Sequence, residues 1–311
     1  MSSALFTTAQ AAPARFPGWC CSYCGEPLSA SEHGLVCAQE ARFFATDQGV
    51  HRLLPEDRHA SLRPFLELYQ RVRRDEGWRA ETVGAASGPH AALWRGREAR
   101  LQSAFRLVAE TLGPGPWRAL DVGAGSCWIS ARLSQAGHRV AAVDINLDPD
   151  DGLMAAPRLV GGGSHLERAE AELDALPLEP QSFDLVVCGA SLHYAANLQR
   201  ALVELRRVTR RDGVLLVLDS PVYRSRPDGE AMLAQRMALW TDRFGVPTQR
   251  EGQSGYLVKG ELDDMFAPAG WRLEIHGWPG RLREGLRDII EVSRHGRRTA
   301  RFPILLARRD G

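Results

Sequence analysis

A glycine turn between a hydrophobic strand and a helix is the feature that most constrains how this chain folds. Residues 117–124 read WRALDVGA, and Gly125 follows shortly before a helical segment that begins at Trp128. A strand, a glycine turn and a helix in this order are typical of doubly wound sheets, in which ligands bind at the carboxyl ends of the strands. Gly123 and Gly125 allow the backbone to approach a ligand without a Cβ atom in between. The segment predicts an α/β fold with a small-molecule site at the turn.

Apolar strands and helices alternate along the rest of the chain. Strands are expected at WRALDVGA, HRVAAVDIN, FDLVVCGAS and VLLVLDSP, and later at WRLEIHGW and RFPILLARR. Helices are expected at 128–135, 196–211 (closed by Asp212-Gly213), 230–244 and 261–266, while HLERAEAEL is helix-like but ambiguous. Nearly continuous apolar strands indicate a parallel sheet that is covered on both faces.

The ligand class follows from the residues around the turn. A dinucleotide site needs a small residue where this chain has Trp128, and a P-loop is excluded because Lys259 is the only lysine. Asp121 at the strand end suits a ligand with an ammonium group. Asp144 ends the next strand and can accept hydrogen bonds from both ribose hydroxyls. These features fit S-adenosylmethionine, which has an ammonium, a carboxylate and a sulfonium but no phosphate.

The segment 115–220 resembles a class I S-adenosylmethionine-dependent methyltransferase of the group that includes quinone-biosynthesis and small-molecule methyltransferases. The matching pieces are ALDVGAG, AAVDIN, ELDALPL, SFDLVVCGASLHY and VLLVLDSP, in this order. The resemblance implies a Rossmann-like, mostly parallel sheet of seven strands with helices on both faces and an antiparallel last strand, RFPILLARR. The chain departs from the pattern at Cys127, where a glycine is often found, and at Glu172, where aspartate is commoner.

The resemblance also implies the cofactor contacts, position by position. They are Asp121, Gly123, Gly125, Asp144, Ile145, Asn146, Glu172, Leu173 and Gly189. The first three would contact the methionine part and Asp144 the ribose. Ile145 would pack on the adenine, whose edge Glu172 and Leu173 would read. Gly189 would lie beside the sulfonium.

Candidate catalytic residues follow the fourth and fifth strands of the series. A general base is needed only if the methyl acceptor carries a proton at its own pKa. His193 and Tyr223 are the candidates, with Tyr194 and Asp219 beside them. For His193 we favour packing or a cofactor contact over a role as base, and Tyr223 is equally suited to lining the substrate pocket.

A cysteine cluster near the N-terminus indicates metal before disulfides. Cys21-x2-Cys24 is followed, after twelve intervening residues, by Cys37, and thiolates at this spacing can surround Zn²⁺ from two turns. The stretch resembles small zinc-ribbon modules, but the second knuckle reads Cys-Ala-Gln-Glu and lacks the fourth thiolate. Glu40, His33 or Cys20 could substitute; alternatively the knuckle is held by packing alone. A bound zinc would be structural.

Four parts are predicted along the chain. They are a flexible leader at 1–18, a zinc-ribbon-like module at 19–58, two lid helices within 59–112, and a methyltransferase domain at 113–311 with a substrate cap at about 221–290. Four lid residues are candidates for contact with the cofactor carboxylate or the substrate, although for any single one of them we favour the interpretation as a solvated helix arginine or a core aromatic residue. They are Tyr69, Arg73, Trp94 and Arg97.

The predicted function is methyl transfer to a small molecule, apolar or aromatic because the cap is rich in large aromatic residues. One alternative is a ribosomal or transfer RNA base methyltransferase, suggested by a zinc ribbon ahead of this fold and by ten arginines among residues 271–311. The net charge of +1 and the lack of an Asn/Asp-Pro-Pro-Tyr/Phe motif count against it. A second alternative is a non-catalytic binding module. No apolar run is long enough for a membrane span, and the few cysteines favour the cytoplasm.

Overall fold

The computed structural model describes residues 16–310 except 86, 161–165, 246–251, 281–286, 289 and 295. The predicted leader lies almost entirely outside the described residues. The strands of the main sheet are β1 (Ser29–Ser31), β2 (Gly34–Cys37), β3 (Arg42–Asp47), β4 (Val50–Arg52), β5 (Arg118–Val122), β6 (Arg139–Asp144), β7 (Leu166–Glu170), β8 (Phe183–Gly189), β9 (Thr209–Leu218), β12 (Trp271–His276) and β13 (Ile304–Arg309). A small two-stranded sheet pairs β10 (Val222–Tyr223) with β11 (Leu257–Val258).

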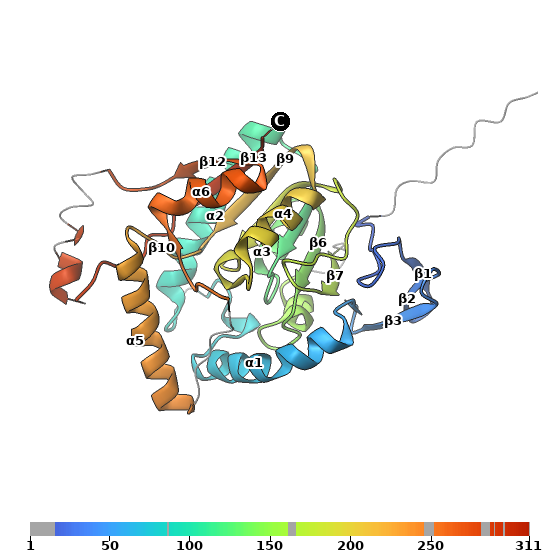
Figure 1. Cartoon of the computed structure of the whole chain (residues 1–311), viewed down its shortest axis with the longest axis horizontal. Helices are drawn as coiled ribbons and strands as arrows, with labels where there is room; N and C mark the ends of the chain where they lie inside the picture. The colour runs from blue at the N-terminus through green and yellow to red at the C-terminus, as the bar shows by residue number, and fades with distance from the viewer. Residues whose placement is uncertain are drawn as a thin grey trace, which may run out of the picture.

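The helices whose residues are all described number six (Figure 1). They are α1 (Glu56–Asp75), α2 (Ala91–Leu112), α3 (Trp128–Gln135), α4 (Leu198–Val208), α5 (Arg226–Phe244) and α6 (Leu262–Phe266). Short 3-10 turns occur at η1 (Ala80–Thr82), η2 (Leu153–Arg158), η3 (Leu192–Tyr194), η4 (Lys259–Glu261) and η5 (Ala267–Ala269). Within the part of the chain that the structure describes, no helix is both long and apolar enough for a membrane crossing.

The main sheet has eleven strands in the order β1-β2-β3-β4-β7-β6-β5-β8-β9-β13-β12, so the expected number of seven is wrong. The last seven strands in this order reproduce the expected sheet. The other four come from the N-terminal segment, and β4 pairs in parallel with β7, Val50 opposite Arg168. The free edge of β7 offers unpaired backbone groups, which the N-terminal strands satisfy. The last strand, β13, is antiparallel to both of its neighbours, as expected.

Alternating residues of the central strands supply two hydrophobic cores. On one face, Leu101 of α2 and Ile129 of α3 pack on Leu185 of β8. On the other face, Leu202 of α4 and Phe266 of α6 belong to the cluster that includes the opposite residues of the same strands. Each fully buried large aliphatic side chain contributes about 2 kcal/mol. The two cores fix the sheet, and with it the positions of the loops at its carboxyl edge.

Two local expectations are corrected by the structure. The helix-like segment HLERAEAEL contains strand β7, because pairing with β4 and β6 overrides the helix propensity of its alanines and glutamates. The helix expected at 196–211 ends at Val208, and Gly213, predicted to stop it, lies inside β9. The register between β8 and β9 is irregular there, and a Cβ at Gly213 would lie 2.9 Å from the Asp184 carbonyl oxygen. The glycine therefore serves a close backbone approach and not a helix end.

Candidate active site

A cavity of about 410 Å³ opens at the carboxyl edge of the central strands, a size that suits a small-molecule ligand. Its floor comes from the loops that follow β5, β6, β7, β8 and β9, and its walls come from α1, α2, α5 and the segment before β13. In Figure 1, α1 and α5 flank the side of the sheet on which these loops lie. The position is the one that the glycine turn predicts for a ligand.

The two glycines of the turn lie in the cavity wall, both with positive φ, but for different reasons. At Gly123 (φ 69°) a Cβ would lie 2.3 Å from the Cβ of Ser191, so the protein itself requires glycine there. At Gly125 (φ 51°) the nearest atom to such a Cβ would be the Asp151 carbonyl oxygen at 3.7 Å. Gly125 therefore leaves free space towards the cavity, and Gly123 allows the loops after β5 and β8 to pack together.

Asp121 lies behind the turn and is not among the residues that line the cavity. Its Oδ2 accepts hydrogen bonds from the Ser130 backbone N–H at 3.1 Å and the Ser130 hydroxyl at 2.6 Å. Burial raises the pKa of Asp121 to about 6. The carboxylate thus ties β5 to the first turn of α3, and its predicted contact with the methionine part stays a prediction.

Asp144 lies at the end of β6 in the cavity wall. Its carboxylate accepts hydrogen bonds from the backbone N–H groups of Gly125 and Asn146, each at 2.7 Å. Burial raises its pKa. Each oxygen retains a further lone pair for a ligand. Ile145 packs against Leu66 of α1, so α1 closes this side of the site.

Glu172 and Leu173 also line the cavity, in the loop after β7. Glu172 is buried and receives two hydrogen bonds from Arg58 of α1, at 2.8 and 2.9 Å. Arg58 did not emerge from the sequence, since it is separated from Glu172 by 114 residues. The same holds for Gln70, whose side-chain amide donates to Asn146 at 2.9 Å. Helix α1 therefore supports both predicted nucleoside-binding loops.

Gly189, His193 and Tyr223 line the cavity beyond the glycine turn. A Cβ at Gly189 would lie 2.3 Å from the Ile129 side chain, so packing explains this glycine. The His193 Nδ1 lies 3.1 Å from the Ser220 hydroxyl, and burial, Arg236 and Arg97 lower the pKa of the ring to about 3. Burial raises the pKa of Tyr223. His193 is therefore neutral near pH 7 and a weak proton acceptor, and the phenol is protonated.

The four lid residues of interest all line the cavity. Arg73 is paired with Asp151, with one hydrogen bond of 3.0 Å, so it is not a solvated helix arginine. Arg97 lies 3.5 Å from Asp219, which also accepts a hydrogen bond of 2.7 Å from Arg100.

Tyr69 and Trp94 form aromatic parts of the same wall. Tyr69 stacks on Phe65 with ring centroids 5.8 Å apart, and the buried Trp94 meets Trp128 edge to face at 5.3 Å. The Trp94 indole N–H has no hydrogen-bond partner among the described residues. A buried donor without a partner in a cavity wall is a ready contact for a ligand.

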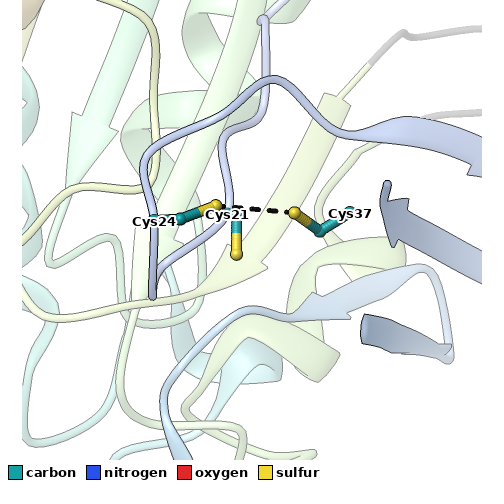
Figure 2. Close-up of side chains that lie close together, drawn as sticks. All are labelled: Cys21, Cys24 and Cys37. Carbon is teal, nitrogen blue, oxygen red and sulfur yellow. Dashed lines mark hydrogen bonds between the residues drawn. The ribbon is translucent and has the colours of Figure 1, made fainter. Parts of the chain in front are cut away.

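Cys21, Cys24 and Cys37 come together as the spacing predicts, with their Sγ atoms within 4.8 Å of one another (Figure 2). The Sγ atoms of Cys24 and Cys37 are 3.5 Å apart. Of the three candidate fourth ligands, Glu40 contacts Cys37 only through its backbone N–H, and Cys20 directs its thiol towards the Gly18 carbonyl at 3.9 Å. The third, His33, is largely exposed and lies 3.8 Å from Glu32. Among the described residues the cluster therefore offers three potential metal ligands.

The region that forms the site matches a known protein family. Residues 120–217 match the family described as "Methyltransferase domain", and these residues include the glycine turn, β6, the Glu172 loop and the loop after β8. The match covers about a third of the chain. This part of the chain is similar in sequence to methyltransferase domains.

Two named relatives share the same region. The chain is 31% identical over 137 residues to a malonyl-[acyl-carrier protein] O-methyltransferase of Erwinia pyrifoliae, a match that covers 44% of this chain and 50% of that protein. It is 26% identical over 165 residues to a demethylmenaquinone methyltransferase of Mycolicibacterium paratuberculosis, with 45% and 68% covered. The chain thus spans only half the length of the first of these relatives.

Among solved structures, a Burkholderia thailandensis 1,6-didemethyltoxoflavin-N1-methyltransferase with bound 1,6-didemethyltoxoflavin and S-adenosylhomocysteine is similar. The identity is 19% and the TM-score 0.47, with 90% of this chain and 100% of that chain covered.

Proposed function

We propose that this protein is an S-adenosylmethionine-dependent methyltransferase that methylates a small-molecule acceptor. The observation that carries the proposal is the cavity at the carboxyl edge of the sheet. Eight of the nine predicted cofactor residues line it, all except Asp121, and they belong to four separate loops. The methyltransferase domain match over residues 120–217 supports the same conclusion.

The residues of the site suit this cofactor chemically. The lone pairs that Asp144 has left are available to two ribose hydroxyls, and Gly125 leaves its face of the turn open. Ile145 and Leu173 offer apolar surface for a base. Bound there, the cofactor would supply a methyl group activated by a positively charged sulfur.

The chain's own contribution is alignment and exclusion of water. The aromatic residues of α1 and α2 cover the cavity, and proximity is a large part of catalysis in a direct group transfer. His193 is neutral and weakly basic, which suits positioning of the acceptor better than removal of a proton. We assign His193 and Tyr223 to the acceptor side of the cavity.

Calorimetry with S-adenosylhomocysteine tests the proposal. Wild-type protein is expected to bind it, and Asp144→Ala to bind about 100-fold more weakly, because two hydrogen bonds to a charged group are lost. Asp212→Ala, which changes an exposed acid in β9, is the matched control and should bind normally. Wild-type protein that does not bind, or unchanged affinity in Asp144→Ala, would refute the assignment.

We propose further that the three thiols bind a structural Zn²⁺. In a tetrahedral site with Zn–S bonds of about 2.3 Å, sulfur atoms are about 3.8 Å apart, close to the separation of Cys24 and Cys37. Elemental analysis should find about one zinc per chain, lost in Cys37→Ser and retained in Cys20→Ser, whose thiol faces away. Metal-free wild-type protein would contradict this.

The division of the chain at residues 18, 58 and 112 is likewise a proposal. It is supported by the different roles of the parts: strands β1–β4 extend the sheet, and α1 and α2 cover the cavity. The cytoplasmic location stays a prediction from cysteine usage.

A further inference from the structure

Arg236 of α5 lines the cavity and forms no ion pair with another described residue. Its Nε is buried without a hydrogen-bond partner among the described residues. None of the ion pairs between described residues includes Arg236, whereas Arg226 and Arg243 of the same helix pair with Glu261 and Asp75. A partly buried guanidinium without an acid beside it is a favourable contact for a negatively charged ligand group.

The other buried charges of the cavity have partners within the protein. Arg73 pairs with Asp151, and Glu172 pairs with Arg58. Arg97 shares Asp219 with Arg100. Among the described residues, Arg236 therefore has no acid of its own, on the side that α5 provides, while Arg97 and Arg100 have one carboxylate between them. Arg79 also lines the cavity but is exposed at its rim.

The surroundings of Arg236 keep its guanidinium in place. Gly255 (φ 70°) lies so close that a Cβ there would be 2.8 Å from Nη2 of Arg236. The ring of Trp240 lies 4.9 Å from the guanidinium carbon, close enough for a cation–π contact. The charge of Arg236 also contributes to the lowered pKa of His193, which shows that the two groups are near each other.

The cavity wall also has apolar residues outside the strand-end loops, beside polar ones such as His193 and Tyr223. The apolar residues include Met232, Pro221, Ala300 and Phe302. One fixed cation next to apolar surface fits an acceptor with a single negative group on an apolar body. We favour a carboxylate over a phosphate ester, because one planar guanidinium matches the charge and the two oxygens of a carboxylate, whereas a dianion needs a second cation beside it.

We propose that Arg236 is a specificity-determining residue that binds a carboxylate of the methyl acceptor. The inference rests on the proposed methyltransferase function and narrows its substrate class to small carboxylates with an apolar or aromatic body. The guanidinium would donate two parallel hydrogen bonds to the carboxylate, while the apolar wall would contact the rest of the molecule.

Ligand-observed NMR titration of the complex with S-adenosylhomocysteine tests this proposal, with benzoate as the probe and benzamide as its neutral counterpart. Wild-type protein should bind benzoate about tenfold more tightly than benzamide, because only benzoate makes charge-assisted hydrogen bonds. Arg236→Gln should bind benzoate about tenfold more weakly and benzamide unchanged. Arg243→Gln, on the same helix but outside the cavity, should behave as wild type.

The outcomes separate this proposal from the general one. If wild-type protein does not bind S-adenosylhomocysteine, the proposed function itself fails. If it binds S-adenosylhomocysteine but prefers benzamide, or does not bind benzoate, the carboxylate assignment is wrong. Unchanged benzoate affinity in Arg236→Gln would likewise overturn the role of Arg236. Normal S-adenosylhomocysteine binding by Arg236→Gln shows that the variant is folded.

Discussion

The two sides of the cavity are built in different ways. The side proposed for the cofactor consists of loops that directly follow parallel strands, and its polar groups are held by backbone N–H groups, as in Asp144. The side proposed for the acceptor consists of side chains from α1, α2, α5 and the region before β13, including Arg236, which has no ion-pair partner among the described residues. We expect substitutions on the cofactor side to disturb the fold, because the sheet fixes its loops. On the acceptor side, we expect single substitutions to change the ligand specificity.

The largest effect that tests this contrast is expected from the two glycines of the turn. Gly123→Ala should destabilise the protein by about 3 kcal/mol, because its Cβ would overlap Ser191 and φ is positive. Gly125→Ala should cost only about 1 kcal/mol, since only the backbone conformation is strained. Urea denaturation measures both. Equal losses would show that the loop after β8 does not limit Gly123.

The same two variants distinguish a glycine that is needed for packing from one that is needed for ligand binding. Gly125→Ala should weaken S-adenosylhomocysteine binding by more than its small loss of stability suggests, because the added Cβ faces the cavity. Calorimetry on the folded variant measures this. Wild-type affinity in Gly125→Ala would place the cofactor farther from the turn than we propose.

The next effect concerns His193 on the acceptor side. Its folded pKa of about 3 lies below the ordinary value of 6.5, so the unfolded chain binds more protons as the pH falls. Stability is fully present above about pH 6.5 and is lost towards pH 3. Between about pH 7 and pH 5 this histidine should lower the free energy of unfolding by about 2 kcal/mol.

Denaturation of His193→Gln at both pH values isolates that contribution. Between pH 7 and pH 5, the free energy of unfolding of this variant should fall by about 2 kcal/mol less than that of the wild type. His33→Gln, at a largely exposed histidine, is the control and should keep the wild-type pH dependence. A wild-type slope in His193→Gln would mean that the ring is not buried in its neutral form.

The smallest effect is expected where α1 supports the cofactor side. Arg58→Ala removes both hydrogen bonds to the buried Glu172 and should cost about 1 kcal/mol, a modest value because Arg58 is itself half-exposed. The affinity for S-adenosylhomocysteine should fall about fivefold, as the Glu172 loop loses its support. Arg63→Ala, an exposed position on the same helix, is the control. Unchanged affinity would show that Glu172 does not depend on α1.

The part of the site that could be predicted from the sequence depends on patterns within short segments of the chain. Gly123, Gly125, Asp144 and Gly189 lie in or directly after apolar strands, and parallel strands bring their carboxyl ends to one edge. The sequence predicted where these glycines lie but not why each must be glycine. The residues that would clash with a Cβ, such as Ser191, belong to other loops.

The four extra strands of the main sheet could not be predicted in the same way. Nothing in the sequence indicates that β4 pairs with β7 across more than a hundred residues. The same long-range pairing made a strand of the helix-like segment that contains β7. Strand pairing depends on which edge is free in the folded protein, and local composition carries no information about that.

The sequence by itself determined the α/β class, the glycine turn, the acid at the end of β6 and the cluster of three cysteines, because each depends on neighbours within a few residues or on a repeated strand pattern. Only the tertiary structure decided that Arg58 binds Glu172, that Arg97 and Arg100 share Asp219, and that Arg236 forms no ion pair with another described residue. The reason is physical: a buried charge is set by the groups that surround it, and those groups come together only when distant segments pack.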